Sequence, residues 1–252
     1  ETGAVNIGNY SALVAARDRM HLGIAPTQHI ITQMKKAQKM GNPFQVAVVI
    51  GADPVIGYVA VSKAPYGHNE MAVACGLAGQ ALETVKCKTV DLEVPADAEI
   101  VLEGYVVPGE LRTEGPFGDH TGYYSPADQY PVFHLTAITH RHNPIYPTII
   151  VGRPVQEDYY MGKATERLFM PIIQMVLPEV VDINMPAEGV FHNLVIVSIK
   201  KEYPGQARKV MYALWGLGLM MLDKAIIVVD ASVNVQDLSE VAWRVTNNLD
   251  PA

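Results

Sequence analysis

The sequence has little cysteine, and its two cysteines, Cys75 and Cys87, form no CxxC pair of the kind that binds zinc. Two cysteines are also too few for a disulfide framework. No run of about 18 apolar residues occurs, which predicts that no helix spans a membrane, and the sequence shows no signal peptide. We therefore expect two reduced thiols in a cytoplasmic protein.

Positive charge is scarce as well. The chain has 19 lysines and arginines against 26 acidic residues, which gives a formal net charge of −7. Proteins that bind nucleic acid by neutralising phosphates concentrate lysine and arginine in one region. The basic clusters here, such as Lys35, Lys36 and Lys39, are small and typical of a solvated helix face. The composition therefore argues against a nucleic-acid partner.

Hydrophobic residues, in contrast, are plentiful. They make up 49% of the 252 residues, while charged residues make up 18%, so the chain can bury a sizeable core. This length predicts one large domain or two small ones. The pattern changes from mainly strand-like to alternating strand and helix near residues 152–162. We therefore expect one domain over residues 1–155 and a second over 156–252.

The periodicity predicts the following elements in the first domain: strands at 46–50, 56–61, 99–107, 132–140 and 145–151, a hairpin turn at 142–144, and a helix over 27–40. Thr27 is the expected N-cap of this helix, and Gly41 is expected to end it. The second domain is predicted to contain a helix over 163–177 interrupted at Pro171, strands at 193–199 and 225–230, and helices over 206–222 and 237–249. Strand and helix in alternation predict a sheet with crossover helices.

Two carboxylates stand close together in the segment EGPFGDHTGY at residues 114–123. Glycines and a proline separate Glu114 from Asp119 and permit a tight, irregular backbone. Paired carboxyl groups in a poorly solvated pocket raise each other's pKa and can handle a proton. A turn that carries two solvated acids is the alternative, and residue types alone do not decide between them.

A second, looser constellation consists of Asn6, His29 and Glu70. An amide oxygen, an imidazole and a carboxylate together suit Mn²⁺ or Mg²⁺, although a lone histidine is more often a hydrogen-bonded structural residue. Gln28 and His29 fall in the first turn of the predicted helix, where free N–H groups and the helix dipole favour a phosphate. Lys224 precedes a predicted strand, where it is either a phosphate contact or a solvated strand start.

Longer motifs resemble the UbiD family of decarboxylases. These are EVPADAEIVLEG at 93–104, EGPFGD at 114–119, ITHR at 138–141, NPIY at 143–146 and GRP at 152–154. The similarity runs over essentially the whole chain and implies a mixed α+β fold, with an FMN-binding split β-barrel-like domain followed by an α/β domain. The segments MGKATER at 161–167 and WGLG at 215–218 are most similar to the subgroup assigned to menaquinone biosynthesis by the futalosine route.

The resemblance implies an activity and its cofactors. Members of the family reversibly and non-oxidatively decarboxylate aromatic or α,β-unsaturated acids with prenylated FMN, which a flavin prenyltransferase supplies. The family metal is manganese, often with potassium nearby, and Asn6, His29 and Glu70 match its ligands. Glu114 and Asp119 match the family's paired acids, with Asp119 as proton donor. The implied cofactor contacts are Asn6, Ile7, Gly8, Asn9, Tyr10, Ser11, Gln28, His29, Glu70 and Lys224.

One position departs from the family pattern. Ser11 stands where the family has a catalytic arginine, and serine cannot form the bidentate pair that an arginine makes with a carboxylate. Either another arginine (Arg17, Arg19 or Arg112) takes its place, or the chain is a catalytically impaired flavin- and metal-binding subunit of a multi-subunit carboxylase. A metal-dependent hydrolase is a weaker alternative, because no water-activating ligand set is evident.

Compared with the family, the chain corresponds to a central portion. It begins without methionine, and the resemblance implies an N-terminal segment before it and a C-terminal oligomerisation region after it. We therefore expect a second domain that is incomplete at its C-terminal end, and a homo-oligomer formed through regions outside this chain.

Overall fold

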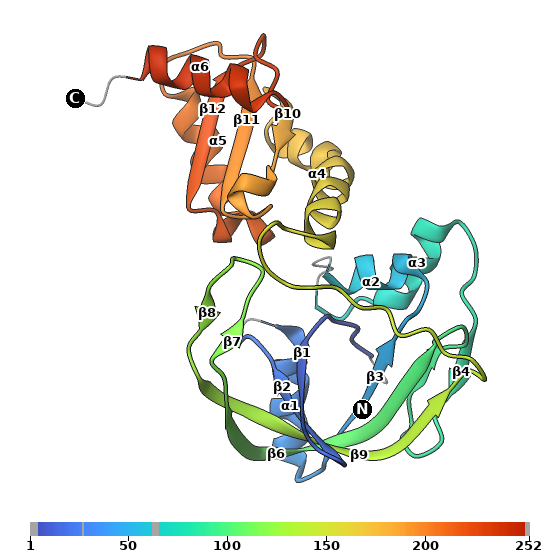
Figure 1. The fold of residues 1–252 in the computed structure, drawn as a ribbon. Coiled ribbons are helices and arrows are strands. Elements are labelled where there is room, and N and C mark those ends of the chain that lie inside the picture. The colour runs from blue at the N-terminus through green and yellow to red at the C-terminus, as the bar shows by residue number, and fades with distance from the viewer. Residues whose placement is uncertain (1–4, 27, 62–65, 250–252) are drawn as a thin grey trace. The chain divides into compact units, whose positions relative to one another are not determined.

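The computed structural model describes residues 5–26, 28–61 and 66–249, and the chain forms two compact units (Figure 1). Unit 1 comprises Glu1–Phe117 and Tyr124–Thr148, and unit 2 comprises Gly118–Tyr123 and Ile149–Ala252. Both units combine helices with a sheet, so the predicted mixed α+β class is confirmed. The motif segment 114–123 therefore contributes residues to both units.

Unit 1 is built on an open five-stranded sheet in the order β1-β2-β9-β6-β3. Its strands are β1 (Ser11–Ala16), β2 (Arg19–Gly23), β9 (Asp128–His140), β6 (Ile100–Glu114) and β3 (Phe44–Ile50), and all neighbours pair antiparallel. The predicted strands at 46–50, 99–107 and 132–140 all belong to this sheet. Gly104 lies where β6 shifts register against β9, and a Cβ there would meet the carbonyl oxygen of His134 at 2.0 Å.

Helix α1 (His29–Met40) packs on this sheet through an apolar face. Ile30, Met34 and Ala37 are buried, as the helical spacing predicts. Gly41 ends the helix in the left-handed conformation with φ 70°, which glycine adopts without strain. The predicted cap, Thr27, lies outside the described residues, and Gln28 occupies the N-cap position.

Two strand predictions in this unit are wrong. Residues 56–61 belong to helix α2 (Pro54–Val61), which begins where Asp53 accepts a hydrogen bond from the backbone N–H of Val55 at 2.9 Å. An aspartate followed by a proline is a helix-start signal, and it overrides the β-branched composition of the run. Residues 145–151 form neither a strand nor the predicted hairpin; the Ile145 N–H donates instead to Glu99 at 3.0 Å.

The remaining elements of unit 1 are short. Helix α3 (Glu70–Ala78) packs against α2 through Ala74, and β4 (Thr84–Lys86) pairs with β5 (Glu93–Pro95). The Asn69 side chain caps α3 by accepting from the N–H groups of Met71 and Ala72. This cap fixes the position of Glu70, the first residue of the helix.

Unit 2 contains a three-stranded sheet in the order β10-β11-β12. Strand β10 (Val180–Asn184) runs antiparallel to β11 (Leu194–Ile199), which is parallel to β12 (Ala225–Asp230). Helix α5 (Gln206–Trp215) connects the parallel pair, so the predicted crossover is confirmed. Val195, Val197 and Ile183 lie at the centre of the core.

The helices of unit 2 differ from the predictions in two places. Helix α4 (Glu157–Val176) continues through Pro171 without the expected interruption. The helix predicted over 206–222 ends at Trp215, because Gly216 follows it and a 3₁₀ turn over Gly218–Leu222 comes next. Helix α6 (Leu238–Asn248) begins after Asp237, whose side chain accepts from the N–H groups of Ser239 and Glu240.

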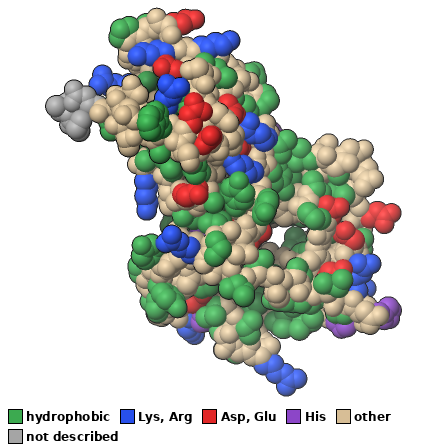
Figure 2. All heavy atoms as spheres, turned by 45° about the horizontal axis from the view of Figure 1, so that its top comes forward, with side chains coloured by type: hydrophobic (Ala, Val, Ile, Leu, Met, Phe, Trp, Pro, Cys, Tyr) green, Lys and Arg blue, Asp and Glu red, His purple; other side chains and the backbone are tan. Residues whose placement is uncertain are grey.

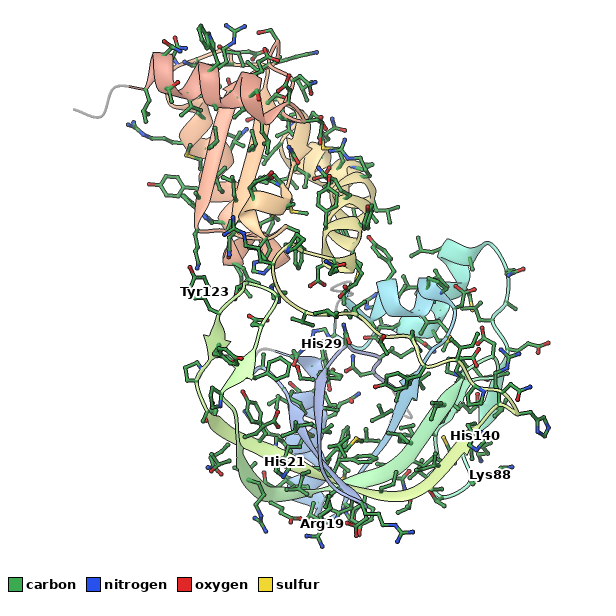
Figure 3. All side chains as sticks on the ribbon, in the orientation of Figure 1. Arg19, His21, His29, Lys88, Tyr123 and His140 are labelled. Atoms are coloured by element: carbon green, nitrogen blue, oxygen red, sulfur yellow. The ribbon has the colours of Figure 1, made fainter. Side chains whose placement is uncertain are left out.

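Between β6 and β9 the chain forms a small hairpin of β7 (Phe117–Gly118) and β8 (Tyr124–Ser125). Tyr123, labelled in Figure 3, lies in the loop that joins these strands. On the face that Figure 2 shows, acidic and basic side chains are interspersed. None of the helices in the described ranges is long and apolar enough to cross a bilayer.

Candidate functional site

Asn6, His29 and Glu70 line one pocket of about 450 Å³ in unit 1. They come from three separate segments: the chain before β1, the first residue of α1 and the first residue of α3. Lys36 and Tyr66 line the same pocket. The structure therefore brings together the three residues that the sequence groups only loosely.

The Glu70 carboxylate is the buried centre of this group. It accepts from the Asn6 side-chain amide at 2.9 Å and from the backbone N–H of Ile7 at 3.4 Å. The Tyr10 hydroxyl donates to the Asn6 oxygen at 3.1 Å, and burial together with the Glu70 charge raises the pKa of Tyr10 to about 12. Tyr10 is therefore a protonated donor at neutral pH, and it fixes the Asn6 amide.

The described lining of the pocket includes Asn6, His29 and Glu70. It does not include the other cofactor residues predicted in unit 1, which are Ile7, Gly8, Asn9, Tyr10, Ser11 and Gln28. Gln28 turns back to accept from the Ala25 N–H at 2.8 Å. Gly8 is covered by the Tyr10 ring, whose hydroxyl lies 2.2 Å from where a Cβ would be. Ser11 is exposed on β1, opposite Gly23.

Whether this pocket suits a metal ion depends on the ligand atoms that its side chains offer. Within residues 5–26, 28–61 and 66–249, no group of three or more His, Cys, Asp and Glu side chains lies close enough to hold an ion. The group formed by Asn6, His29 and Glu70 differs, because one of its members is an amide. Its amide oxygen, imidazole nitrogen and carboxylate are nevertheless donors that suit Mn²⁺ or Mg²⁺.

Glu114, at the end of β6, faces His21 on β2, and these two strands flank β9. Glu114 Oε2 and His21 Nδ1 are 3.9 Å apart, too far for a hydrogen bond, and both atoms are buried without a partner among the described residues. Burial raises the pKa of Glu114, and the nearby His21 opposes this increase. Burial therefore makes the charged form of Glu114 more costly than it is in water.

Two of the arginines that could replace the missing one, Arg19 and Arg112, lie next to acids other than Glu114. Arg19 lies 3.8 Å from Asp18, and Arg112 lies 3.6 Å from Glu110. The basic side chain that faces Glu114 is His21, which the sequence analysis does not identify. His21 and His29, both labelled in Figure 3, lie at separate places in unit 1. No local signal reveals the pair, because only the strand order brings β2 and β6 to either side of β9.

Asp119 lies in unit 2, where it contacts the neighbouring residue His120. Its Oδ1 is 2.7 Å from His120 Nδ1 and accepts from the His120 backbone N–H at 2.9 Å. His120 Nε2 is in turn 2.8 Å from His192 Nε2. The Asp119 carboxylate therefore contacts the His120 ring, which is hydrogen bonded to His192, and the sequence analysis identifies only Asp119.

Lys224 is exposed at the start of β12, where its backbone N–H donates to the Asn193 carbonyl at 2.9 Å. The preceding residue, Asp223, is buried. Neither of its carboxylate oxygens has a hydrogen-bond partner in the part of the chain that the structure describes. Burial alone raises the pKa of Asp223 to about 7. The sequence analysis misses this carboxyl group.

Sequence comparisons match both units. The profile of the 3-octaprenyl-4-hydroxybenzoate carboxy-lyase Rift-related domain, UbiD, matches residues 1–154, and the profile of the C-terminal domain of that enzyme matches residues 159–252. An uncharacterized protein of Archaeoglobus fulgidus is 54% identical over the whole chain, which covers 53% of that relative. The chain therefore spans about half the length of the curated relatives that it matches.

Solved structures of related enzymes match nearly the whole chain, while the chain again covers only about half of each enzyme. The UbiD-class enzyme HmfF from Pelotomaculum thermopropionicum, in complex with FMN, has a TM-score of 0.90 at 33% identity over 99% of this chain and 55% of HmfF. An evolved dimeric form of HmfF was solved with prFMN. The vanillic acid decarboxylase of Sedimentibacter hydroxybenzoicus, in its closed form, has a TM-score of 0.87 at 33% identity over 98% of this chain and 52% of that enzyme.

Proposed function

The chain belongs to the UbiD family, and from this premise we propose that it binds prenylated FMN and decarboxylates an aromatic or α,β-unsaturated carboxylic acid without net oxidation. The observation that carries the proposal is the gathering of Asn6, His29 and Glu70 in one pocket. The complexes of HmfF with FMN and prFMN support the choice of cofactor.

The residues of this pocket fit a divalent metal by the chemistry of their donors. We assign Asn6, His29 and Glu70 to Mn²⁺, which would neutralise the flavin phosphate, with K⁺ as a second ion nearby. Glu70 is already held as an acceptor by Asn6 and Ile7, so little ordering remains for metal binding. Flavin contacts are proposed for the residues of the segment 6–11, Gln28 and Lys224.

Asp119 is the proposed proton donor. Bound prenylated FMN would supply the electron sink for loss of CO₂ from the substrate. Asp119 then gives its proton to the carbon that carried the carboxylate and becomes a carboxylate. Its side chain is 37% exposed, and its Oδ2 accepts a long hydrogen bond of 3.4 Å from the Thr121 hydroxyl, the one hydrogen bond of this oxygen among the described residues, so it can meet a ligand.

Glu114 has a different proposed role. It is buried, and burial raises its pKa; we propose that it tunes the site while Asp119 supplies the proton. The motifs at 161–167 and 215–218 support a substrate in menaquinone biosynthesis, and we propose a homo-oligomer that forms through regions outside this chain.

The function is tested with the full-length protein co-expressed with a flavin prenyltransferase. We expect the visible spectrum and mass of bound prenylated FMN, and release of CO₂ from members of a panel of aromatic and α,β-unsaturated acids. Adding a chelator is expected to lower both flavin content and turnover. A protein that holds prenylated FMN and Mn²⁺ yet decarboxylates no acid on the panel contradicts the proposal.

Ser11 favours a second candidate function, that of a flavin- and metal-binding subunit without activity of its own. The variant Ser11→Arg distinguishes the two, with Ala12→Arg on the same exposed strand as the matched control. A large gain of turnover in Ser11→Arg alone supports the impaired subunit. Unchanged turnover in an active protein supports an enzyme that works without that arginine.

A further inference from the structure

We propose that Lys36 of α1 binds the flavin phosphate, and that the Tyr66 hydroxyl holds the Lys36 side chain in place for this contact. The proposal rests on the proposed function, because it takes the phosphate to lie beside Asn6, His29 and Glu70. It adds a fixed positive charge to the pocket, from a residue that belongs neither to the sequence motifs nor to the proposed metal ligands.

Helix α1 presents one row of side chains to the pocket. His29, Gln33 and Lys36 are spaced four and three residues apart, which puts them on one side of a helix, and all three line the pocket. Lys35 and Lys39, the other lysines of α1, are exposed and do not belong to the described lining. One member of a basic cluster that is typical of a solvated helix face therefore turns to the site.

Tyr66 connects Lys36 to the end of the pocket where His29 lies. Lys36 Nζ donates to the Tyr66 hydroxyl at 3.2 Å and lies 5.4 Å from the centre of the Tyr66 ring, within the range of a cation–π contact. The same ring stands edge-on to the His29 ring, with 5.3 Å between the two centres. These contacts hold the ammonium group beside the ring that packs on His29, so less ordering remains when a ligand binds.

Lys36 has no carboxylate partner among the described residues. The lysines of these ranges that form ion pairs are Lys86, Lys163 and Lys209. An ammonium group has three N–H donors, and the Tyr66 hydroxyl accepts from one of those on Lys36. The other donors suit an anionic acceptor, because hydrogen bonds between charged groups are stronger than those between neutral groups.

The charges of the pocket favour a phosphate as that anion. A phosphate monoester carries about two negative charges at neutral pH. Leaving aside a bound K⁺, such a phosphate, Mn²⁺ and the Glu70 carboxylate together carry about one net negative charge, which the Lys36 ammonium group cancels. Lys36 is exposed, so salt screens its attraction for the phosphate. Riboflavin has no phosphate, so it is expected to gain nothing from Lys36.

The first test measures flavin binding to the Mn²⁺-loaded, full-length protein at low ionic strength, by the quenching of flavin fluorescence. We expect Lys36→Gln to weaken FMN binding by ~10-fold, the low end for a hydrogen bond to a charged group, and to leave riboflavin binding unchanged. The loss is expected to shrink as salt is added.

Lys35→Gln is the matched control, because it removes the same charge from the adjacent, exposed residue of α1. We expect it to leave FMN binding close to that of the wild type. Equal FMN affinities of Lys36→Gln and Lys35→Gln, or an equal loss of FMN and riboflavin binding in Lys36→Gln, overturn the assignment of Lys36. Both outcomes leave the decarboxylase proposal intact.

A double-mutant cycle tests the part assigned to Tyr66. Tyr66→Phe keeps the ring beside His29 and removes the hydroxyl that accepts from Lys36. We expect Tyr66→Phe to weaken FMN binding by ~3-fold in the wild type and to have no further effect in Lys36→Gln. Additive effects of the two substitutions contradict the role of the Tyr66 hydroxyl as the support of Lys36.

The last test needs neither flavin nor activity, so it separates failure of this inference from failure of the proposed function. Mn²⁺ binding to the flavin-free, full-length protein is followed by electron paramagnetic resonance of the free ion. A nearby cation repels Mn²⁺, so Lys36→Gln is expected to bind Mn²⁺ at least as tightly as the wild type. Weaker Mn²⁺ binding in Lys36→Gln than in Lys35→Gln would mean that Lys36 supports the pocket itself, which overturns its role as a phosphate contact. A wild type that takes up no FMN overturns both this inference and the proposed function.

Discussion

The two acids of the segment 114–123 stand five positions apart in the sequence, yet they lie in opposite environments. Glu114 is buried in unit 1, with one oxygen and the facing His21 nitrogen both without hydrogen-bond partners among the described residues. Asp119, in unit 2, is half-buried; its carboxylate accepts from the His120 backbone N–H, and the His120 ring is hydrogen bonded to His192. Each acid has a histidine ring near it, at 3.9 Å for Glu114 and at 2.7 Å for Asp119.

This difference teaches what a carboxyl–histidine pair can do. The His21 ring, 3.9 Å from the Glu114 carboxylate, only partly offsets the cost of burying Glu114. The pKa of Glu114 is therefore still raised. At 2.7 Å the His120 ring lies directly against the Asp119 carboxylate, which also accepts from the His120 backbone N–H. Neighbouring acids in one motif therefore need not share one role.

The largest expected effect is on turnover. Asp119→Asn in the cofactor-loaded, full-length protein is expected to lower decarboxylation by ~10²–10⁴-fold, because an amide cannot donate a carboxylic proton. The matched control is Asp128→Asn, since Asp128 is exposed and its side chain accepts from the neighbouring Gln129 N–H at 2.7 Å. Equal activity of the two variants refutes the distinction between the acids.

The next largest effect concerns Asp223, a buried carboxyl group whose pKa is raised by burial alone. Raising that pKa from 3.8 to about 7 means that the folded state holds the proton more tightly than the unfolded state. Stability therefore decreases as the pH rises from about 4 to about 7. Asp223→Asn removes this dependence and is expected to stabilise unit 2 at pH 8 by up to about 4 kcal/mol.

The measurement for Asp223 is denaturant unfolding at pH 8 and pH 5, with the exposed Asp230→Asn as control. The advantage of Asp223→Asn is expected to shrink at pH 5, where the folded wild type keeps its proton. A variant that is less stable than wild type at pH 8 would show that Asp223 has a partner that stabilises its charge.

Glu114→Gln is expected to have a smaller effect of the same sign. Burial raises the pKa of Glu114, so its charge destabilises the fold as the pH rises through that pKa, and the neutral amide avoids this cost. We expect a modest gain in stability at pH 8 that is lost at low pH, where Glu114 is itself neutral. Glu110→Gln makes a sharp control, because hydrogen bonding to His134 lowers the pKa of Glu110 and its loss destabilises the fold at pH 8. Stabilisation by both variants, or by neither, contradicts this account.

The smallest effect is expected for His21→Phe. His21 opposes the rise in the pKa of Glu114, so the pKa of Glu114 is expected to rise further without it. Only a small fall in stability at pH 8 is expected, because burial has a larger effect on the pKa of Glu114 than His21 has. A ¹³C NMR titration of the Glu114 carboxyl group measures the shift, and a lower pKa in the variant contradicts the assigned role of His21.

Much of the fold could be predicted from local pattern. The apolar spacing of Ile30, Met34 and Ala37 predicts α1, and Gly41 predicts its end. The error at 56–61 arose because a β-branched run reads as a strand, while Asp53 and Pro54 start a helix there. Strand order was beyond local pattern, because it depends on contacts between residues far apart in the sequence.

The candidate site could be predicted only where a resemblance supplied the residues. Asn6, His29 and Glu70 do line one pocket, although their spacing gives no reason to group them. His21, His192 and Asp223 carry no motif, and their significance follows from burial and from partners on other elements. The tertiary environment, and not the residue type, decides whether such groups are buried without partners or joined in a network.

The most direct test of the central claim, that Asp119 handles the proton and Glu114 does not, is solvent hydrogen exchange at the product carbon. Cofactor-loaded, full-length wild type, Asp119→Asn and Glu114→Gln are incubated with product in D₂O, and deuterium at the carbon that carried the carboxylate is followed by NMR. We predict that the wild type exchanges, that Glu114→Gln still exchanges, and that Asp119→Asn is slower by ~10²-fold or more. Exchange at the wild-type rate in Asp119→Asn would contradict the claim.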